Sequence, residues 1–270
     1  MARKEALKPF DAHCHLDSEN FKLNQEEVIE RAKKVLSGIL NLGLDPISNR
    51  ATLELAKKYP GFIYAALAIH PTSIHEFTDE QIEEEINFIR KNKKKIIAIG
   101  EAGLDYKWIK KVLPAEIGKE NAAKQEARQI KWFREFIRLA NELDIPIIIH
   151  SRWGAGKVIE ILEEEKPKKA VLHRFGGTVE QMKQGIKLGC KISLSPTAFT
   201  PPPVEYLNEL DIDACTVETD APYMQYCGKP SEPVNVLDAV KELANLKKIS
   251  EEDVIKITNK NIKELFGIKF

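Results

Sequence analysis

The stretch FDAHCHLD, residues 10–17, begins with an apolar residue and then alternates acidic or imidazole side chains with smaller ones. Side chains of a β-strand alternate between two faces, so we expect a strand that carries Asp11, His13 and His15 on one face. Two imidazoles that leave a sheet side by side can chelate a metal ion, although a His-x-His pair alone is more often structural or merely exposed. The case for a metal therefore depends on ligands from other strands.

Seven further apolar, β-rich runs follow, and amphipathic helical stretches separate them along the whole chain. The runs predict strands at residues 10–15, 38–42, 62–69, 95–100, 145–149, 170–172, 190–194 and 214–218. Eight strands, each followed by helical sequence, are typical of a closed parallel TIM-type (β/α)8 barrel, here with extra C-terminal helices. The 270 residues suit one such barrel and contain no linker, so we predict a single domain over residues 1–270.

Polar residues gather where the predicted strands end, which is where barrels of this kind build their active sites. Five of the six histidines belong to this set. Its members are His13, His15, His70, Glu101, His150, His173 and Asp220. Burying so many imidazoles and carboxylates together is costly without a cation, so we predict a metal site at the barrel mouth. Glu218 has the same strand parity as Asp220 and is a candidate for orienting a ligand.

The composition narrows the possible partners. Lysine and arginine number 41, as do aspartate and glutamate, so the net charge is zero and any nucleic-acid contact is expected to be local to a pocket. No run reaches the roughly 18 apolar residues of a membrane span, and Met1–Lys8 lacks a signal-peptide core, so we expect a cytoplasmic protein without membrane contact. The 30% of charged residues is a mild indication of a thermophile. We expect reduced thiols at Cys14, Cys190, Cys215 and Cys227.

Several segments are given structural roles. The connection over Lys107–Lys124 is longer than any other and predicts a loop that serves as a lid or a binding loop. His75 is expected in an exposed loop, and Lys91–Lys95 is expected to be a solvated helix end rather than a nucleic-acid patch. Cys14, on the strand face opposite to the histidines, is expected to pack against the rest of the protein.

Six motifs of this chain, in order, resemble those of the TatD family of metal-dependent hydrolases, usually called TatD-type deoxyribonucleases, within the amidohydrolase superfamily. They lie at residues 11–17, 69–71, 99–106, 146–152, 172–177 and 218–223. The resemblance extends from about Phe10 to Phe266. Three features depart from the common bacterial pattern and suggest an archaeal-type member. They are the long Lys107–Lys124 segment, the motif His173-Arg174-Phe175 in place of the frequent His-Cys-Phe, and the sequence over residues 228–233.

The resemblance implies two divalent metal ions, and the sequence does not choose among Mg, Mn and Zn. The implied ligands are His13, His15, Glu101 and Asp220 for one ion, and Glu101, His150 and His173 for the other. Glu101 bridges the two ions and is thereby also a catalytic residue. Two such ions can activate water and stabilise charge on a phosphoryl oxygen.

The remaining site residues are assigned to proton transfer and substrate binding. Asp220 is a candidate general base, and His70 is a candidate catalytic residue that also holds the phosphate, together with Arg152 and Arg174. Tyr106 is a candidate for orienting the substrate. The resulting hypothesis is a deoxyribonuclease that hydrolyses phosphodiester bonds, acting as a 3′-5′ exonuclease on single strands or ends of DNA, without an obligate protein partner.

Three alternatives stay open. A hydrolase of the same barrel that cuts an amide, ester or aminoacyl bond needs one oxyanion pocket and no phosphate-binding arginines, so Arg152 and Arg174 weigh weakly against it. A non-catalytic metal-binding protein is disfavoured because every ligand position is filled. A purely structural barrel leaves the clustered histidines unexplained.

Overall fold

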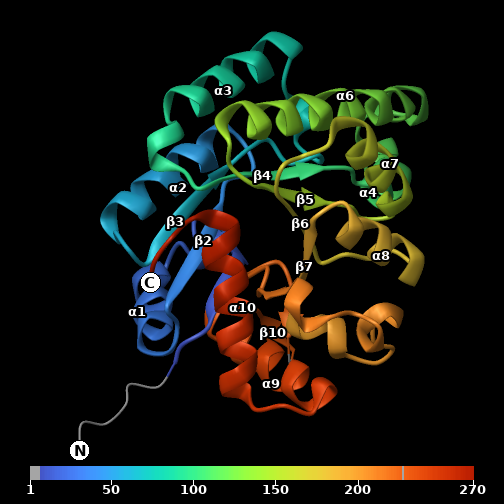
Figure 1. Cartoon of the computed structure of the whole chain (residues 1–270). Coiled ribbons are helices and arrows are strands. Elements are labelled where there is room, and N and C mark those ends of the chain that lie inside the picture. The colour runs from blue at the N-terminus through green and yellow to red at the C-terminus, as the bar shows by residue number, and fades with distance from the viewer. Residues whose placement is uncertain (1–6, 227) are drawn as a thin grey trace, which may run out of the picture.

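The computed structural model describes residues 7–226 and 228–270. At its centre eight parallel strands pair in sequence order, and helices surround them (Figure 1). The strands are β1 (Phe10–Cys14), β2 (Gly38–Leu42), β3 (Ile63–Leu67), β4 (Ala98–Gly103), β5 (Ile147–His150), β6 (Ala170–His173), β7 (Cys190–Leu194) and β8 (Cys215–Val217). The predicted (β/α)8 barrel is confirmed. The predictions for Cys227 and for the first six residues lie outside the described part of the chain.

Backbone hydrogen bonds just beyond β8 join the last strand to the first. The amide of His15 donates to the carbonyl of Ala221 at 2.8 Å, and the amide of Asp220 donates to the carbonyl of His13 at 2.9 Å. Cys14 and Ala221 form a parallel bridge in the same place. The barrel is thus nearly closed, and Asp220 lies beside two histidines from the opposite end of the chain.

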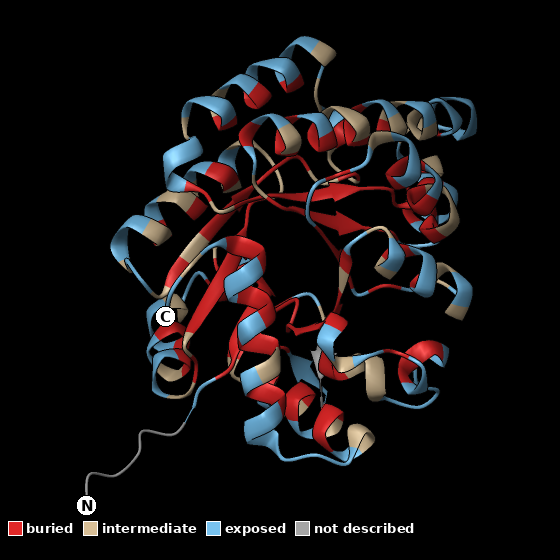
Figure 2. Ribbon diagram, viewed as in Figure 1, coloured by how far each residue is buried: buried red, intermediate tan, exposed pale blue. Residues whose placement is uncertain are grey.

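Helices cover the outside of the barrel. Between strands they are α1 (Gln25–Val35), α2 (Pro46–Lys58), α3 (Asp79–Lys91), α4 (Tyr106–Lys111), α5 (Leu113–Ile117), α6 (Lys119–Leu143), α7 (Ala155–Glu165) and α8 (Val179–Lys187). After β8 follow the short antiparallel pair β9 (Gln225–Tyr226) and β10 (Lys229–Pro230), then α9 (Val236–Lys247) and α10 (Glu251–Phe266). Figure 2 shows buried strands inside helices whose outer faces are exposed. No helix in the described ranges is both long and apolar enough to cross a membrane.

Two layers of buried apolar side chains stabilise the barrel, because successive strand residues face opposite sides. In β5, Ile147 and Ile149 belong to the large layer between strands and helices, whereas Ile148 belongs to a smaller cluster inside the barrel. Leu265 and Phe266 of α10 join the inner cluster. The next inward position of β5 is its last residue, where the polar mouth begins.

An irregularity in β1 decides which of its side chains face inward. Phe10 and Ala12 belong to the inner cluster, and the register of β1 against β2 then shifts. After the shift, His13 and His15 face the centre of the mouth, whereas Asp11 bonds to the segment that follows β8. The expectation that Asp11 shares one face with both histidines was wrong, because a strand with a register shift does not keep a period of two.

A second register shift, between β4 and β5, accompanies the placement of Glu101. The strand predicted at residues 95–100 runs instead over Ala98–Gly103, so Glu101 lies within the strand rather than after it. Gly103 has φ +149°, and a Cβ at this residue would lie 2.0 Å from the carbonyl oxygen of His150. The glycine therefore lets the ends of β4 and β5 approach each other closely.

The segment predicted as a long loop, Lys107–Lys124, is helical and comprises α4 from its second residue, α5 and the start of α6. Its apolar residues Trp108 and Leu113 are buried in the outer layer. His75, expected to be exposed, packs on Trp108 with ring centres 4.8 Å apart. The loop expectation was wrong because Trp108 and Leu113 anchor this polar segment in the apolar layer. The expectation for His75 was wrong because the buried Trp108 gives its ring a packing partner. Lys91 and Lys93–Lys95 are exposed, as expected of a solvated helix end.

Candidate metal centre

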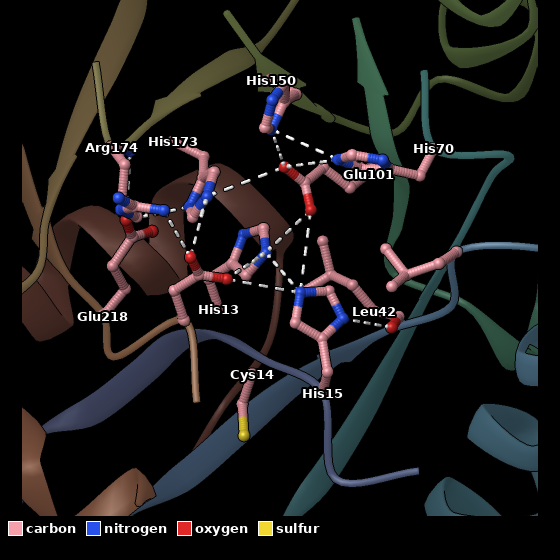
Figure 3. Close-up of polar contacts among 12 residues, drawn as sticks. His13, Cys14, His15, Leu42, His70, Glu101, His150, His173, Arg174 and Glu218 are labelled. Carbon is pink, nitrogen blue, oxygen red and sulfur yellow. Dashed lines mark hydrogen bonds and ion pairs between the residues drawn. The ribbon is translucent and has the colours of Figure 1, made fainter. Parts of the chain in front are cut away.

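The ends of β1, β4, β5 and β6 and the segment after β8 deliver charged side chains to one point at the barrel mouth (Figure 3). Three groups each have ligand atoms within 4.8 Å of one another, namely His13–His15–Asp220, His13–His173–Glu218 and His70–Glu101–His150, of which the first two share His13. All are buried except His70, which is partly exposed. The structure thus brings together all six predicted ligand residues. Cys14 points away from them and packs in the apolar layer, as predicted.

Glu101 lies between two sets of imidazoles, one for each carboxylate oxygen. Its Oε2 is 3.2 Å from Nε2 of His13 and 3.7 Å from Nε2 of His15. Its Oε1 is 2.6 Å from Nδ1 of His150 and 3.6 Å from Nε2 of His173. Each oxygen of this carboxylate therefore faces a different pair of imidazoles, and the two pairs meet where the rings of His13 and His173 stack with centres 3.6 Å apart.

Asp220 completes the side of the cluster formed by β1. Its Oδ1 lies 3.8 Å from Nε2 of His13 and 3.5 Å from Nε2 of His15. Its Oδ2 lies 3.8 Å from Nε2 of His173 and accepts a hydrogen bond of 2.7 Å from Nη1 of Arg174. The second oxygen is thus shared between a ligand histidine and a cation at the rim.

Oxygen atoms behind two of the imidazoles favour tautomers whose lone pairs face the carboxylates. Nδ1 of His15 lies 2.9 Å from the carbonyl oxygen of Leu42, which can only accept, so this nitrogen carries the proton of the neutral ring. Oε1 of Glu218 lies 2.9 Å from Nδ1 of His173 and favours the same tautomer there. In each neutral ring Nε2 then aims a lone pair at carboxylate oxygens, an arrangement that calls for an added proton or a bound cation. These residues fit a divalent metal site.

His70 presents a donor to the centre instead of a lone pair. The amide of Thr72 donates to its Nδ1 at 3.2 Å, so the neutral ring carries its proton on Nε2. That Nε2 lies 3.7 Å from Oε1 of Glu101 and 3.3 Å from Nδ1 of His150. A donor in this position suits a phosphate oxygen better than a metal ion, in keeping with the role predicted for His70.

The pKa values indicate how strongly the carboxylates demand positive charge. Burial and the neighbouring His173 lower the pKa of His13 to about 4. Burial also opposes protonation of His15 and His150, but Asp220 and Glu101 respectively outweigh it and raise both pKa values to about 9. Burial alone would raise the pKa of Glu101, yet the surrounding imidazoles hold it well below its usual range.

Asp105 is a functional candidate that the sequence pattern alone does not single out. Its Oδ2 lies 3.0 Å from Nε2 of His150 and 2.6 Å from Nη2 of Arg152, and its Oδ1 accepts from the amide of Trp108 at the start of α4. It therefore orients a predicted ligand and caps a helix at once. The signal in the sequence was a carboxylate placed four residues after Glu101, directly before a helix.

The predicted substrate-binding residues differ in what they contact. Nε and Nη2 of Arg152 are engaged by Asp105, although 44% of the side chain is exposed. The hydroxyl of Tyr106 is buried, and burial together with Glu126 of α6 raises its pKa above the ordinary value. Tyr106 is thus directed toward the helical layer, and the structure does not bring its hydroxyl into the ligand cluster. Arg174 contacts that cluster directly through Asp220.

Asp11 is a second residue whose role became visible only in the structure. It accepts hydrogen bonds from the hydroxyl of Thr219 at 2.6 Å and from its amide at 2.9 Å, and from the amide of His13 at 3.2 Å. Burial raises the pKa of this carboxyl well above its usual value. Asp11 therefore ties β1 to the segment that carries Asp220.

Comparisons with known proteins identify relatives of the whole chain. The family model "TatD related DNase" matches residues 10–267. The uncharacterized metal-dependent hydrolase YabD of Bacillus subtilis is 35% identical, over 96% of this chain and 99% of that protein. The human deoxyribonuclease TATDN3 is 28% identical, over 95% of this chain and 93% of that protein. The crystal structure of YjjV, a TatD homologue from Escherichia coli, superposes with a TM-score of 0.84 at 26% identity, covering 96% of this chain and 98% of that one.

Proposed function

The chain belongs to the TatD family of metal-dependent hydrolases, and from this premise we propose that it is a deoxyribonuclease that removes nucleotides from DNA ends with the help of two divalent cations. The observation that carries the proposal is the position of Glu101, whose two oxygens face different groups of imidazoles. A shared carboxylate of this kind suits two adjacent cations, as in two-metal phosphatases and nucleases. The name of the relative TATDN3, a deoxyribonuclease, supports DNA as the substrate.

The proposed ligand sets are His13, His15, Glu101 and Asp220 for one cation, and Glu101, His150 and His173 for the other. When bound, divalent cations supply Lewis acidity for a phosphoryl oxygen and lower the pKa of coordinated water. Mixed nitrogen and oxygen ligands suit Mg, Mn or Zn. Asp105 and Glu218 lie against the outer nitrogens of His150 and His173, at 3.0 Å and 2.9 Å, and are proposed to orient the inner nitrogens toward a cation.

Asp220 is the proposed general base. Burial alone would raise its pKa, but His173, His15 and Arg174 outweigh this effect and hold the pKa well below its usual range. The carboxylate therefore stays ionised at neutral pH, as a general base must, although so low a pKa makes it a weak base; we propose that it accepts the proton of the attacking water. Its hydrogen bond to Arg174 fixes the orientation in which it does so.

Three side chains are proposed to bind the scissile phosphate. His70 offers its Nε2–H toward the centre of the site. Arg174 uses Nη1 on Asp220, and its remaining N–H groups are proposed to bind a phosphate oxygen. Arg152 has two nitrogens on Asp105, so we propose that it binds phosphate through Nη1 alone and mainly orients Asp105. Several donors of this kind suit a phosphodiester, which has several oxygens to bind. A carbonyl substrate needs only a single oxyanion pocket.

The direct test is a time course on single-stranded and duplex DNA with added Mg, Mn or Zn. Separate 5′ and 3′ labels report the polarity, which we propose to be 3′ to 5′ from the family resemblance alone. Wild type should produce a ladder of DNA fragments that shortens from one end, and Glu101→Gln should produce no such ladder. Asp220→Asn should retain bound metal but lose cleavage. The contrary result is a protein that contains two metal ions and hydrolyses a carboxyl ester but leaves DNA intact. It would overturn the proposal and indicate a carbonyl hydrolase.

A further inference from the structure

An edge of aromatic and basic side chains borders the barrel mouth, in the turn after β5 and on α4. Trp153 lies three residues after the predicted ligand His150 and is 58% exposed, whereas Trp108 and Trp132 are buried. Nζ of Lys107 lies 6.0 Å from the centre of the Trp153 ring. We call Trp153, Lys107, Lys110 and Lys111 the α4 edge.

The backbone ties the α4 edge to the metal centre. The amide of Tyr106, the first residue of α4, donates to the carbonyl of Arg152 at 2.9 Å. Asp105, which caps α4, contacts both His150 and Arg152. Figure 1 shows α4 and α7 on the same side of the barrel, next to the ends of the strands that carry the site. A group bound at this edge is therefore positioned relative to the predicted ligands.

The three lysines share one face of α4, because residues spaced by three and four lie on the same side of a helix. All three are exposed, while Trp108 and Ile109 are buried on the other side. None of the three lies within ion-pairing distance of a carboxylate belonging to residues 7–226 or 228–270. In a protein of zero net charge, this is a local cationic strip beside the mouth.

Trp153 has a backbone conformation that does not favour it. Its φ is +61°, a left-handed conformation that is uncommon for a bulky residue. More than half of its side chain is exposed, so burial offers little compensation for the strain. A residue that strains the turn and projects its ring into solvent beside a catalytic site suggests a role outside folding.

We propose that Trp153 is a positioning residue that stacks on a nucleobase of the substrate strand, while Lys107, Lys110 and Lys111 neutralise phosphates of the same strand. The inference rests on the proposed function. Aromatic stacking tolerates any sequence because every base has a flat face, and a cationic strip follows the backbone. Bases inside a duplex hide their faces, so the α4 edge engages a single strand or a frayed end.

The stacking test crosses two substitutions with two substrates. Trp153→Gly removes the ring and accepts the left-handed turn, so its melting temperature should not fall; Trp153→Phe keeps a ring. On a single-stranded oligonucleotide, Trp153→Gly should raise KM about tenfold with little change in kcat, and Trp153→Phe should stay near wild type. On an oligonucleotide whose bases near the cleaved end are replaced by abasic residues, wild type and Trp153→Gly should have equal KM values.

The lysine test uses the salt dependence of binding. Replacing Lys107, Lys110 and Lys111 with glutamine should weaken binding of a labelled single strand to the cleavage-deficient Glu101→Gln protein. It should also reduce the slope of log K against log salt by up to about 2, roughly 0.7 for each phosphate that the variant no longer neutralises. The matched control replaces Lys93, Lys94 and Lys95, which are equally exposed but precede β4 at the opposite end of the barrel.

The outcomes separate this inference from the proposed function. Oligonucleotide binding that depends on Trp153, by metal-loaded protein that keeps Glu101 yet cleaves no DNA, supports the α4 edge and contradicts the nuclease proposal. Cleavage with the same KM in wild type and Trp153→Gly overturns the α4 edge and leaves the nuclease proposal intact. The α4 edge is also overturned if Trp153→Gly raises KM equally on intact and abasic strands. It is likewise overturned if replacing Lys93, Lys94 and Lys95 weakens binding as much as replacing Lys107, Lys110 and Lys111.

Discussion

Two clusters of acidic and basic side chains in this protein differ in their access to water. At the mouth, Glu101 and Asp220 are buried with several imidazoles. On the surface, Asp79 at the start of α3 pairs with Arg128 at 2.7 Å and Lys131 at 2.6 Å on α6, and its side chain is 40% exposed. Water screens the surface cluster and can replace any partner. It cannot do so at the mouth, where protonated imidazoles or a bound cation must balance the carboxylates.

The difference shows which electrostatic contacts serve folding and which serve chemistry. The surface cluster joins α3 to α6 with charges of opposite sign, so it is complete as it stands. The mouth concentrates carboxylates and imidazole lone pairs that become complementary only when a proton or a cation is added. Substitutions in the two clusters should therefore change different properties of the protein.

The largest effect is expected for Glu101→Gln, which removes the carboxylate that faces both imidazole groups. Activity on DNA should fall at least about 1000-fold, as when a main source of transition-state stabilisation is removed, and bound metal should decrease. Steady-state kinetics and elemental analysis of the protein measure the two. Glu142→Gln, which disrupts an exposed pair with Arg90, is the matched control and should leave both unchanged. Full activity of Glu101→Gln would contradict the inference that the cluster at the mouth serves chemistry and the surface cluster serves folding.

Metal removal should have the next largest effect, on stability. At a metal concentration of about 100 times Kd, binding to the folded state contributes about 2.7 kcal/mol. For a chain of this length, chelation should lower the melting temperature by roughly 5–10 °C, and added metal should restore it. The shift should be much smaller in Glu101→Gln. Equal melting temperatures for metal-loaded and metal-free wild type would show that the mouth balances its own charge.

A smaller effect is expected for Asp105→Asn, which weakens the partner of His150 without touching the other ligands. Metal affinity or activity should fall about 10- to 100-fold, the usual consequence of removing a residue that orients a ligand. Asp45→Asn is the control, because Asp45 also accepts backbone N–H groups at a helix start but contacts no ligand. Asparagine caps helices well, so neither variant should lose much stability. If Asp105→Asn and Asp45→Asn had the same metal affinity and activity, Asp105 would serve only as a helix cap.

The smallest effect is expected for Asp79→Asn. Hydrogen bonds from Lys131 and Arg128 lower the pKa of Asp79 to about 2, so the group is more acidic in the folded state than an ordinary aspartate with a pKa of 3.8. Its contribution to stability is complete above about pH 4 and is lost as the pH falls toward 2. Because the pair is screened, that contribution is at most about 1 kcal/mol at pH 7.

Urea unfolding of wild type and Asp79→Asn at pH 7 and pH 3 measures this difference, which should shrink at the lower pH and in high salt. DNA cleavage at pH 7 should be unchanged. A difference that grows as the pH falls has the wrong sign for a carboxylate with a lowered pKa.

The local pattern of the chain was sufficient to predict the barrel and the residues at its mouth. Alternating apolar runs and helical stretches carry the (β/α)8 order, and strands that end in His150 and His173 place these residues at one end of a parallel barrel. Periodicity failed where packing overrode it. The segment Lys107–Lys124 became helical because Trp108 and Leu113 are buried, and His75 packs against the same tryptophan.

The sequence by itself determined the architecture and the kind of side chain at each strand end, because these depend on composition and on a period of two within short segments. Only the tertiary structure decided how the side chains meet. The register shifts in β1 and β4 accompany the inward placement of His13, His15 and Glu101, and Asp105 engages both His150 and Arg152. Those contacts depend on the register between neighbouring strands and on the approach of residues far apart in the chain, which local periodicity does not encode.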